Sequence, residues 1–209
     1  NSLTGARLPG LMAEFRRNFH FAPERERDFS IEIDPRTVDA ADIGTLREIG
    51  FNRVSLGIQD FDPQVQQAIN RLQDTDRIRT ILDACRRHGF QSVNFDLIYG
   101  LPMQNTETFA ATLDTVAGMR PDRIALYSYA HMPELFKAQN KINVVTLPDP
   151  ERKLALFQLA VERLIGEGYV YIGMDHFALP GDELSRAQDS GDLHRNFMGY
   201  TTRKQTDLV

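Results

Sequence analysis

The sequence is poor in cysteine, tryptophan and long apolar runs, and these shortages exclude several classes of protein. The one cysteine, Cys85, excludes an internal disulfide framework and any site that needs several thiolates from this chain. Cys85 lies at helical spacing from Ile78 and Leu82, which favours a buried helix face over a reactive thiol. No stretch approaches the roughly 20 apolar residues that span a bilayer, and no targeting segment opens the chain. We therefore expect a cytoplasmic protein without a membrane span.

Runs of basic charge are also lacking. The chain has 24 basic and 29 acidic residues and a formal net charge of -5. Binding to a nucleic-acid backbone needs clustered cations, so we do not expect nucleic acid as a partner.

The 209 residues are 42% hydrophobic, which is enough for a sizeable core. We expect one domain over residues 1–209, in which 174–209 form a polar, irregular extension, and a monomer.

Short apolar runs alternate with longer segments of helical period. This rhythm is typical of an α/β fold with a parallel sheet and crossover helices. The strands are predicted at 29–33, 53–58, 92–98, 122–127 and 169–173. The helices are predicted at 8–19, 39–49, from about 63, and at 74–88, 106–118 and 150–166. Five parallel strands neither close a barrel nor cover their own edges, so the chain is interpreted as part of a larger β/α barrel.

Every predicted strand ends in polar residues, and parallel β/α folds place their chemistry at the C-terminal ends of strands. Any single position could equally be a surface or capping residue. Five in succession favour the hypothesis that these side chains converge on one site. The residues are Glu32, Gln59, Asp96, Tyr127 with Tyr129, and Asp175 with His176.

Three motifs resemble the radical S-adenosylmethionine superfamily, in the branch that contains oxygen-independent coproporphyrinogen III oxidases and heme chaperones. They are Ser-Ile-Glu-Ile-Asp-Pro at 30–35, the segment 51–61 around Gly57-Ile58-Gln59-Asp60, and 94–102, which ends in Tyr-Gly-Leu-Pro. Residues 129–133 and 173–202 resemble the oxidases, and the second of these stretches is not shared by the chaperones. The resemblance covers nearly the whole chain and implies a partial parallel β/α barrel that lacks its first two strands here.

The resemblance implies two S-adenosylmethionine molecules and a [4Fe–4S] cluster. Glu32 would bind the molecule that chelates the cluster, and the second molecule would contact Gln59, Arg71, Asp96 and Ala130. The three-cysteine loop that holds the cluster in the family has no counterpart in this chain. Catalysis is therefore assigned to the intact parent protein, the fragment alone is expected to be inactive, and no metal ligand is expected in this chain.

The implied reaction begins with a 5′-deoxyadenosyl radical that abstracts hydrogen from a propionate side chain of coproporphyrinogen III. Loss of carbon dioxide leaves a vinyl group, and two rounds give protoporphyrinogen IX. The implied partners are this substrate and an electron donor for the cluster. Propionates call for cationic and hydrogen-bonding groups, and the candidates are His131, His176, His194 and Arg195.

Three other functions stay open at this point. A heme chaperone of the same branch would bind heme without decarboxylase activity. A β/α-barrel metal hydrolase would use Glu32, Asp96 and His176 with a divalent metal. The third alternative is a non-catalytic fragment with a residual fold. Separately, a metal site built from histidines is disfavoured because a loop separates His176 from His194.

Overall fold

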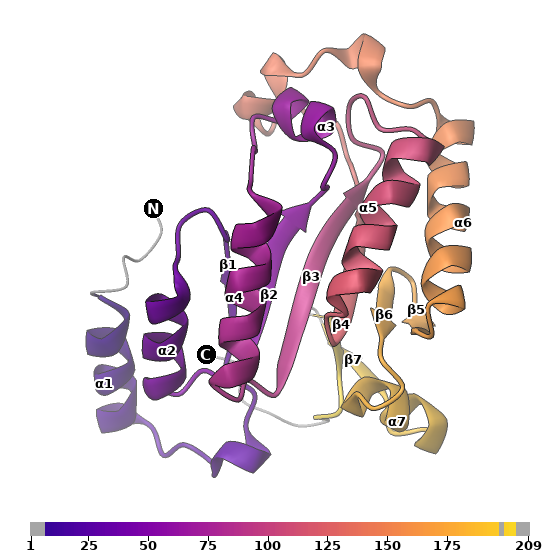
Figure 1. Ribbon diagram of the computed structural model, residues 1–209. Helices are drawn as coiled ribbons and strands as arrows, with labels where there is room; N and C mark the ends of the chain where they lie inside the picture. Colours follow the sequence, from indigo (N-terminus) through magenta and orange to yellow (C-terminus); the bar gives the residue numbers. More distant parts are fainter. Residues whose placement is uncertain (1–6, 197–198, 204–209) are drawn as a thin grey trace. The chain divides into compact units, whose positions relative to one another are not determined.

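The computed structural model describes residues 7–196 and 199–203, which divide into two compact units. The first unit comprises Asn1–Ile58 with Gln73–Phe95, and the second comprises Gln59–Leu72 with Asp96–Val209. One six-stranded, mostly parallel sheet has the strand order β1-β2-β3-β4-β6-β5, and its third strand passes from the first unit into the second. Figure 1 shows the elements of each unit. The α/β fold class predicted from the sequence is confirmed.

The first unit combines strands β1 and β2 with three described α-helices, of which α2 and α4 contact each other. Its elements are α1 (Leu8–Asn18), the 3-10 helix η1 (Glu24–Glu26), β1 (Ser30–Ile33), α2 (Ala40–Glu48), β2 (Arg53–Gln59, of which Gln59 belongs to the second unit), α4 (Thr75–Arg87) and the start of β3 (Ser92–Tyr99). β1 and β2 pair in parallel, with Ser30 opposite Arg53 and Ile33 opposite Leu56.

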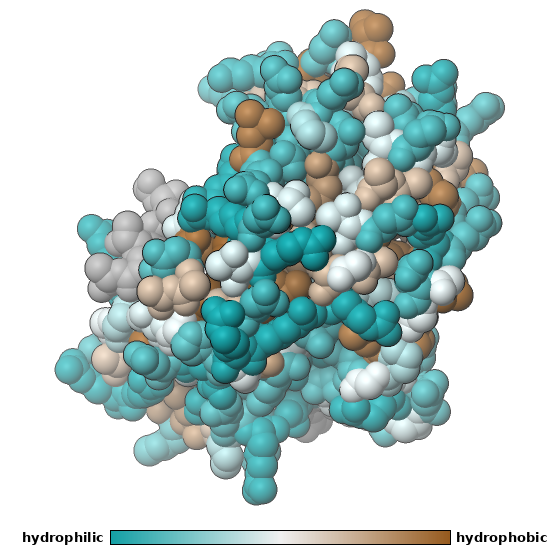
Figure 2. All heavy atoms as spheres, in the orientation of Figure 1, coloured by the Kyte–Doolittle hydropathy of each residue, from teal (hydrophilic) through white to brown (hydrophobic). Residues whose placement is uncertain are grey.

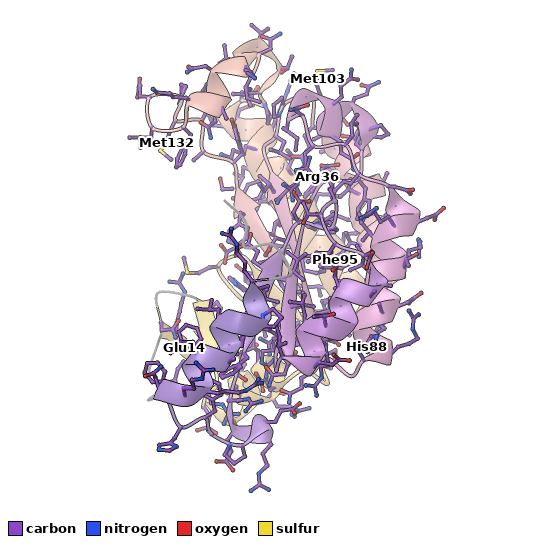
Figure 3. All side chains as sticks on the ribbon, turned by 90° about the vertical axis from the view of Figure 1, so that its left-hand side faces the viewer. Glu14, Arg36, His88, Phe95, Met103 and Met132 are labelled. Atoms are coloured by element: carbon purple, nitrogen blue, oxygen red, sulfur yellow. The ribbon has the colours of Figure 1, made fainter. Side chains whose placement is uncertain are left out.

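Local sequence fixes the helix boundaries of this unit. The Asp39 carboxylate accepts from the backbone N–H of Asp42, and the Asp42 side chain accepts from the Asp39 N–H, which makes a capping box at the start of α2. At the start of α4, the Asp74 carboxylate accepts from the backbone N–H of Asp76, without a reciprocal contact in the capping-box sense. The buried face of α4 includes Cys85, as predicted, and burial raises the pKa of its thiol to about 12. In Figure 3, Phe95 lies on β3 in the interior, where it is 0% exposed.

The second unit contains the rest of the sheet and two long helices. Its remaining elements are α3 (Pro63–Ala68), α5 (Thr106–Met119), β4 (Arg123–Ser128), the 3-10 helices η2 (Lys137–Lys141) and η3 (Val144–Thr146), α6 (Pro150–Gly166), β5 (Val170–Gly173), β6 (His176–Ala178), α7 (Glu183–Ser190), β7 (His194–Asn196) and β8 (Gly199–Thr201). Figure 1 shows α5 and α6 side by side. No described helix is both long and apolar enough to cross a membrane.

The strand at β5 departs from the prediction. A fifth parallel strand was expected there, but β5 pairs antiparallel with β6, and β6 pairs antiparallel with β4. The reason is local: only two turn residues follow Gly173, and Met174 adopts a left-handed φ of 52°. So short a connection joins antiparallel strands, whereas parallel strands need a long crossover. The segment 174–209, expected to be irregular, also carries α7 and the antiparallel hairpin of β7 and β8.

An arm of residues 131–147 links β4 to α6 and exposes several large hydrophobic side chains. The backbone N–H of Met103 donates to the carbonyl of Thr146 at 2.9 Å, which fixes one end of the arm. In Figure 3, Met103 and Met132 lie at the same end of this unit. Figure 2 shows hydrophobic side chains in brown over this segment. The exposed ones are Met132, Leu135, Phe136, Val144 and Val145.

Candidate functional site

The cofactor-binding residues expected from the sequence fall in both units. Glu32 is exposed on β1 of the first unit. The other four belong to the second unit: Gln59 ends β2, Asp96 is 8% exposed within β3, and Ala130 follows β4, while Arg71 is partly buried after α3. The structure thus brings four of the five into one compact unit. The convergence of Glu32 with them stays a prediction.

Gln59 has a strained backbone at the end of its strand. Its φ of 68° lies in the left-handed region, which residues other than glycine adopt at a cost of about 1–3 kcal/mol. Such strain persists only where neighbouring contacts hold the backbone in place. At this position the next residue, Asp60, provides those contacts.

The Asp60 carboxylate is the centre of a buried hydrogen-bond network that the sequence analysis did not single out. It is 0% exposed and accepts from the Asp62 N–H at 2.7 Å, the Thr112 hydroxyl at 2.7 Å and the Gln104 side-chain amide at 2.6 Å. The Asp60 carbonyl accepts from the Gln66 side chain at 2.9 Å. Burial raises the pKa of Asp60, although its three hydrogen bonds oppose the rise.

Gln104 extends this network to the loop that follows β3. Its Oε1 accepts from the N–H of Gly100 at 2.6 Å and from that of Leu101 at 3.3 Å, while Nε2 also donates to the Ile98 carbonyl at 3.1 Å. One amide therefore joins the residue after Gln59 to the Tyr-Gly-Leu-Pro motif. The two loops at the ends of β2 and β3 are held in one rigid arrangement.

The end of β4 is fixed by the arm. The Gln139 side chain donates to the Ala130 carbonyl at 3.0 Å and accepts from the Met132 N–H at 2.5 Å. The Ala130 carbonyl keeps a second lone pair beside its bond to Gln139, so it can still accept a hydrogen bond from a ligand. The Tyr129 hydroxyl lies 3.2 Å from Nδ1 of His131, and burial raises the pKa of Tyr129.

A second cluster lies around Tyr200. Nδ1 of His176 is 2.5 Å from an Asp175 oxygen, and the His176 ring meets the Tyr200 ring edge-on at 5.3 Å. The Arg195 guanidinium lies 5.7 Å from the centre of the same ring. Burial would raise the pKa of Asp175, but the hydrogen bond and charge of His176 together with the charge of Arg195 hold it below its usual value.

Two of the four expected substrate residues therefore come together. His176 and Arg195 contact the same tyrosine ring, and Gly173 leaves room for that ring, since a Cβ there would lie 2.6 Å from the Tyr200 hydroxyl. His131 contacts Tyr129 instead, and His194 lies opposite Thr201 in the terminal hairpin. Within the described part of the chain, no group of three or more His, Cys, Asp or Glu residues could hold a metal ion.

Comparison with known proteins decides the family. The family model described as "Radical SAM superfamily" matches residues 8–116, which is more than half of the chain. The chain belongs to the Radical SAM superfamily. The resemblance stated from the three motifs is confirmed, because the chain is 50% identical over 207 residues to the oxygen-independent coproporphyrinogen III oxidase of Pseudomonas aeruginosa and 49% identical to that of Escherichia coli.

These matches cover 99% of this chain and 45% of each relative, so the chain spans about half the length of the curated relatives it matches. A solved structure of the Escherichia coli coproporphyrinogen III oxidase, described as a Radical SAM enzyme, superposes with a TM-score of 0.94. It is 48% identical, and the match covers 99% of this chain and 47% of that one. The α/β fold with its mostly parallel sheet is thus shared with a known Radical SAM structure.

Radical SAM membership implies S-adenosylmethionine and a [4Fe–4S] cluster. The residues of this chain do not fit the cluster, because its one cysteine, Cys85, is 0% exposed on a helix face. They do fit S-adenosylmethionine, whose ammonium, carboxylate and hydroxyls need carboxylate, cationic and amide partners. Asp96, Arg71 and Gln59 are side chains of these three kinds within the second unit, and their contact with the cofactor is a prediction.

Proposed function

We propose that the whole protein that carries this chain converts two propionate side chains of coproporphyrinogen III into vinyl groups, which gives protoporphyrinogen IX. The observation that carries the proposal is the 50% identity to a coproporphyrinogen III oxidase across 99% of this chain. In each round one C–H bond and one C–COO⁻ bond of a propionate break and a C=C bond forms. Carbon dioxide leaves, and one electron passes to an acceptor.

S-adenosylmethionine, when bound, supplies the hydrogen-abstracting 5′-deoxyadenosyl radical. The proposal assigns Glu32 to one molecule of this cofactor, and Gln59, Arg71, Asp96 and Ala130 to a second. The network of Asp60 and Gln104 supports this assignment, since it holds the loop of Gln59 against the loop after β3. A ligand that meets preformed loops loses less free energy in ordering them.

His176 and Arg195 are proposed to hold one propionate of the substrate. The two side chains contact the Tyr200 ring, and the neighbouring Asp175 carboxylate is engaged by His176. Arg195 forms no ion pair with a described carboxylate and is exposed. A guanidinium presents two parallel N–H donors to a carboxylate, which suits a propionate. His131 and His194 are proposed to serve other propionates.

The same proposal includes an electron donor for the cluster, a monomeric protein and a cytoplasmic location.

The test uses the whole protein, purified without oxygen and with its cluster reconstituted, together with S-adenosylmethionine and coproporphyrinogen III. Release of carbon dioxide with formation of protoporphyrinogen IX is the expected result. Stable capture of heme without carbon dioxide release would identify a heme chaperone and overturn the proposal.

A further inference from the structure

Lys153 lies in the first turn of α6 and directs its ammonium group at the ends of two strands. Its Nζ donates to the carbonyl of Tyr129 at 2.5 Å and lies 5.9 Å from the centre of the Tyr99 ring. Tyr99 closes β3, and Tyr129 follows β4 directly. The Tyr129 N–H also donates to the Tyr99 carbonyl at 2.9 Å. The cation therefore lies where parallel strands end, which is where β/α folds bind their ligands.

The aliphatic part of Lys153 runs across Gly100. A Cβ at position 100 would lie 2.8 Å from Cε and 3.1 Å from Cδ of the lysine, and Gly100 has a φ of 84°. Any larger residue would strain the backbone and displace the lysine. Because Gly100 of the Tyr-Gly-Leu-Pro motif has no side chain, there is space for the Lys153 side chain to reach the strand ends.

The charge of Lys153 has no counterion in the described part of the chain. No carboxylate of residues 7–196 or 199–203 forms an ion pair with it. Partial burial leaves the ammonium less well solvated than one on the open surface, which lowers the pKa of Lys153. An ammonium has three donors, and one of them is used by Tyr129. The remaining donors suit an anion.

We propose that Lys153 receives the carboxylate of a ligand bound at the ends of β3 and β4. The ligand chemistry rests on the proposed function, which offers two sources of a carboxylate: the methionine end of S-adenosylmethionine and a propionate of the tetrapyrrole. The position next to Ala130, an expected contact of the second cofactor molecule, favours S-adenosylmethionine. Arg71 and Lys153 then divide the cationic contacts of that molecule.

The first test compares ligands with and without the carboxylate in the whole holoenzyme. Lys153→Met keeps most of the side-chain length across Gly100 and removes the charge. Loss of one charge-assisted hydrogen bond should weaken S-adenosylmethionine binding by roughly ten- to a hundredfold. Binding of decarboxylated S-adenosylmethionine, which keeps the sulfonium and the ammonium, should change less than about twofold. Lys137→Met, on the exposed arm, is the matched control and should leave both affinities unchanged.

A parallel arm identifies the tetrapyrrole as the source. If Lys153→Met weakens binding of coproporphyrin III but not of its tetramethyl ester, the carboxylate at Lys153 is a propionate. Equal losses for a ligand and its carboxylate-free analogue would overturn the proposal, and so would unchanged affinity for all four. These binding measurements do not depend on turnover. A protein that releases no carbon dioxide but gives the expected affinities would contradict only the proposed function.

A second test measures the reactivity of Lys153 directly in the whole holoenzyme. Reductive methylation followed by mass spectrometry measures the reactivity of each lysine, with Lys137 and Lys141 as internal references. Saturating S-adenosylmethionine or coproporphyrin III should slow methylation of Lys153 at least fivefold and leave both references unchanged. Labelling of Lys153 at an equal rate with and without either ligand, at concentrations that saturate the holoenzyme, would contradict the proposal.

Discussion

The Asp60 carboxylate and the Gln104 side-chain amide are joined by a 2.6 Å hydrogen bond, and the polarity of this contact is fixed from both sides. Gln104 cannot reverse its amide because Oε1 accepts from the Gly100 N–H. Both oxygens of Asp60 must accept hydrogen bonds, because Oδ2 accepts from Gln104 and Oδ1 accepts from the Asp62 N–H and the Thr112 hydroxyl. The pair therefore requires one acid and one amide, in this order.

In Asp60→Asn, the side-chain NH2 group would face either the Asp62 N–H or the Gln104 amide N–H, both of which are donors. We expect a loss of about 1–3 kcal/mol in the free energy of unfolding, the usual penalty for an unsatisfied buried polar group. The double variant Asp60→Asn with Gln104→Glu reverses the order of acid and amide and sets a carboxylate oxygen at position 104 against the Ile98 carbonyl, so it should not recover this loss. Urea denaturation measures all three proteins. Asp114→Asn makes the same chemical change in an exposed ion pair and should cost little.

Gly100→Ala should destabilise the protein by about 1–3 kcal/mol, because alanine would adopt a φ of 84° and its Cβ would meet Lys153. Gly118→Ala is the matched control. Gly118 lies in α5 with nothing within 4 Å of an added Cβ, so alanine should stabilise the helix by about 0.5–1 kcal/mol. Thermal unfolding of the two variants should therefore shift in opposite directions. A common direction would contradict the contact described at Gly100.

The stability of the protein should depend on pH through Asp175. Its folded-state pKa is lowered, so its stabilising contribution is present above the unfolded value near 3.9 and is lost as the pH falls through the lowered value. The difference in unfolding free energy between the wild type and Asp175→Asn should thus be larger at pH 6 than at pH 3, with the loss occurring below about pH 4. A difference that is the same at pH 3 and pH 6 would show that the pair with His176 does not form.

Arg195→Ala should raise the Michaelis constant of the whole enzyme for coproporphyrinogen III, because it removes the guanidinium proposed to hold a propionate. A charge-assisted contact of this kind corresponds to roughly a tenfold effect or more. The Michaelis constant for S-adenosylmethionine should stay unchanged, which separates loss of the substrate contact from general damage. Unchanged substrate kinetics would remove Arg195 from the site.

The sequence predicted most of the fold because local signals mark its elements. Asp39, Asp74 and Asp149 cap helices at the places where the sequence indicates helix starts. β6 was missed because three residues, His176 to Ala178, are too few to show a strand period, and its pairing with β4 depends on contacts far apart in the chain. The parallel direction expected for β5 failed for the same reason.

The site was predicted only as far as its motifs reach. Asp60 lies inside the motif that holds Gln59, but its partners Gln104 and Thr112 are 44 and 52 residues away, and no local pattern links them. Lys153 occupies an amphipathic helix in which one lysine resembles any solvated side chain. The available signal was the glycine of Tyr-Gly-Leu-Pro, since a glycine at a strand end marks close approach of another group.

The most direct test of the account is a graft in which this chain replaces the matching segment of the Escherichia coli coproporphyrinogen III oxidase, which it matches at 49% identity over 207 residues. The host supplies the rest of the protein, so the measurement asks whether the residues of this chain can bind cofactor and substrate. We predict that the graft releases two molecules of carbon dioxide per coproporphyrinogen III and forms protoporphyrinogen IX. A graft that folds and carries its cluster but releases none would contradict the account.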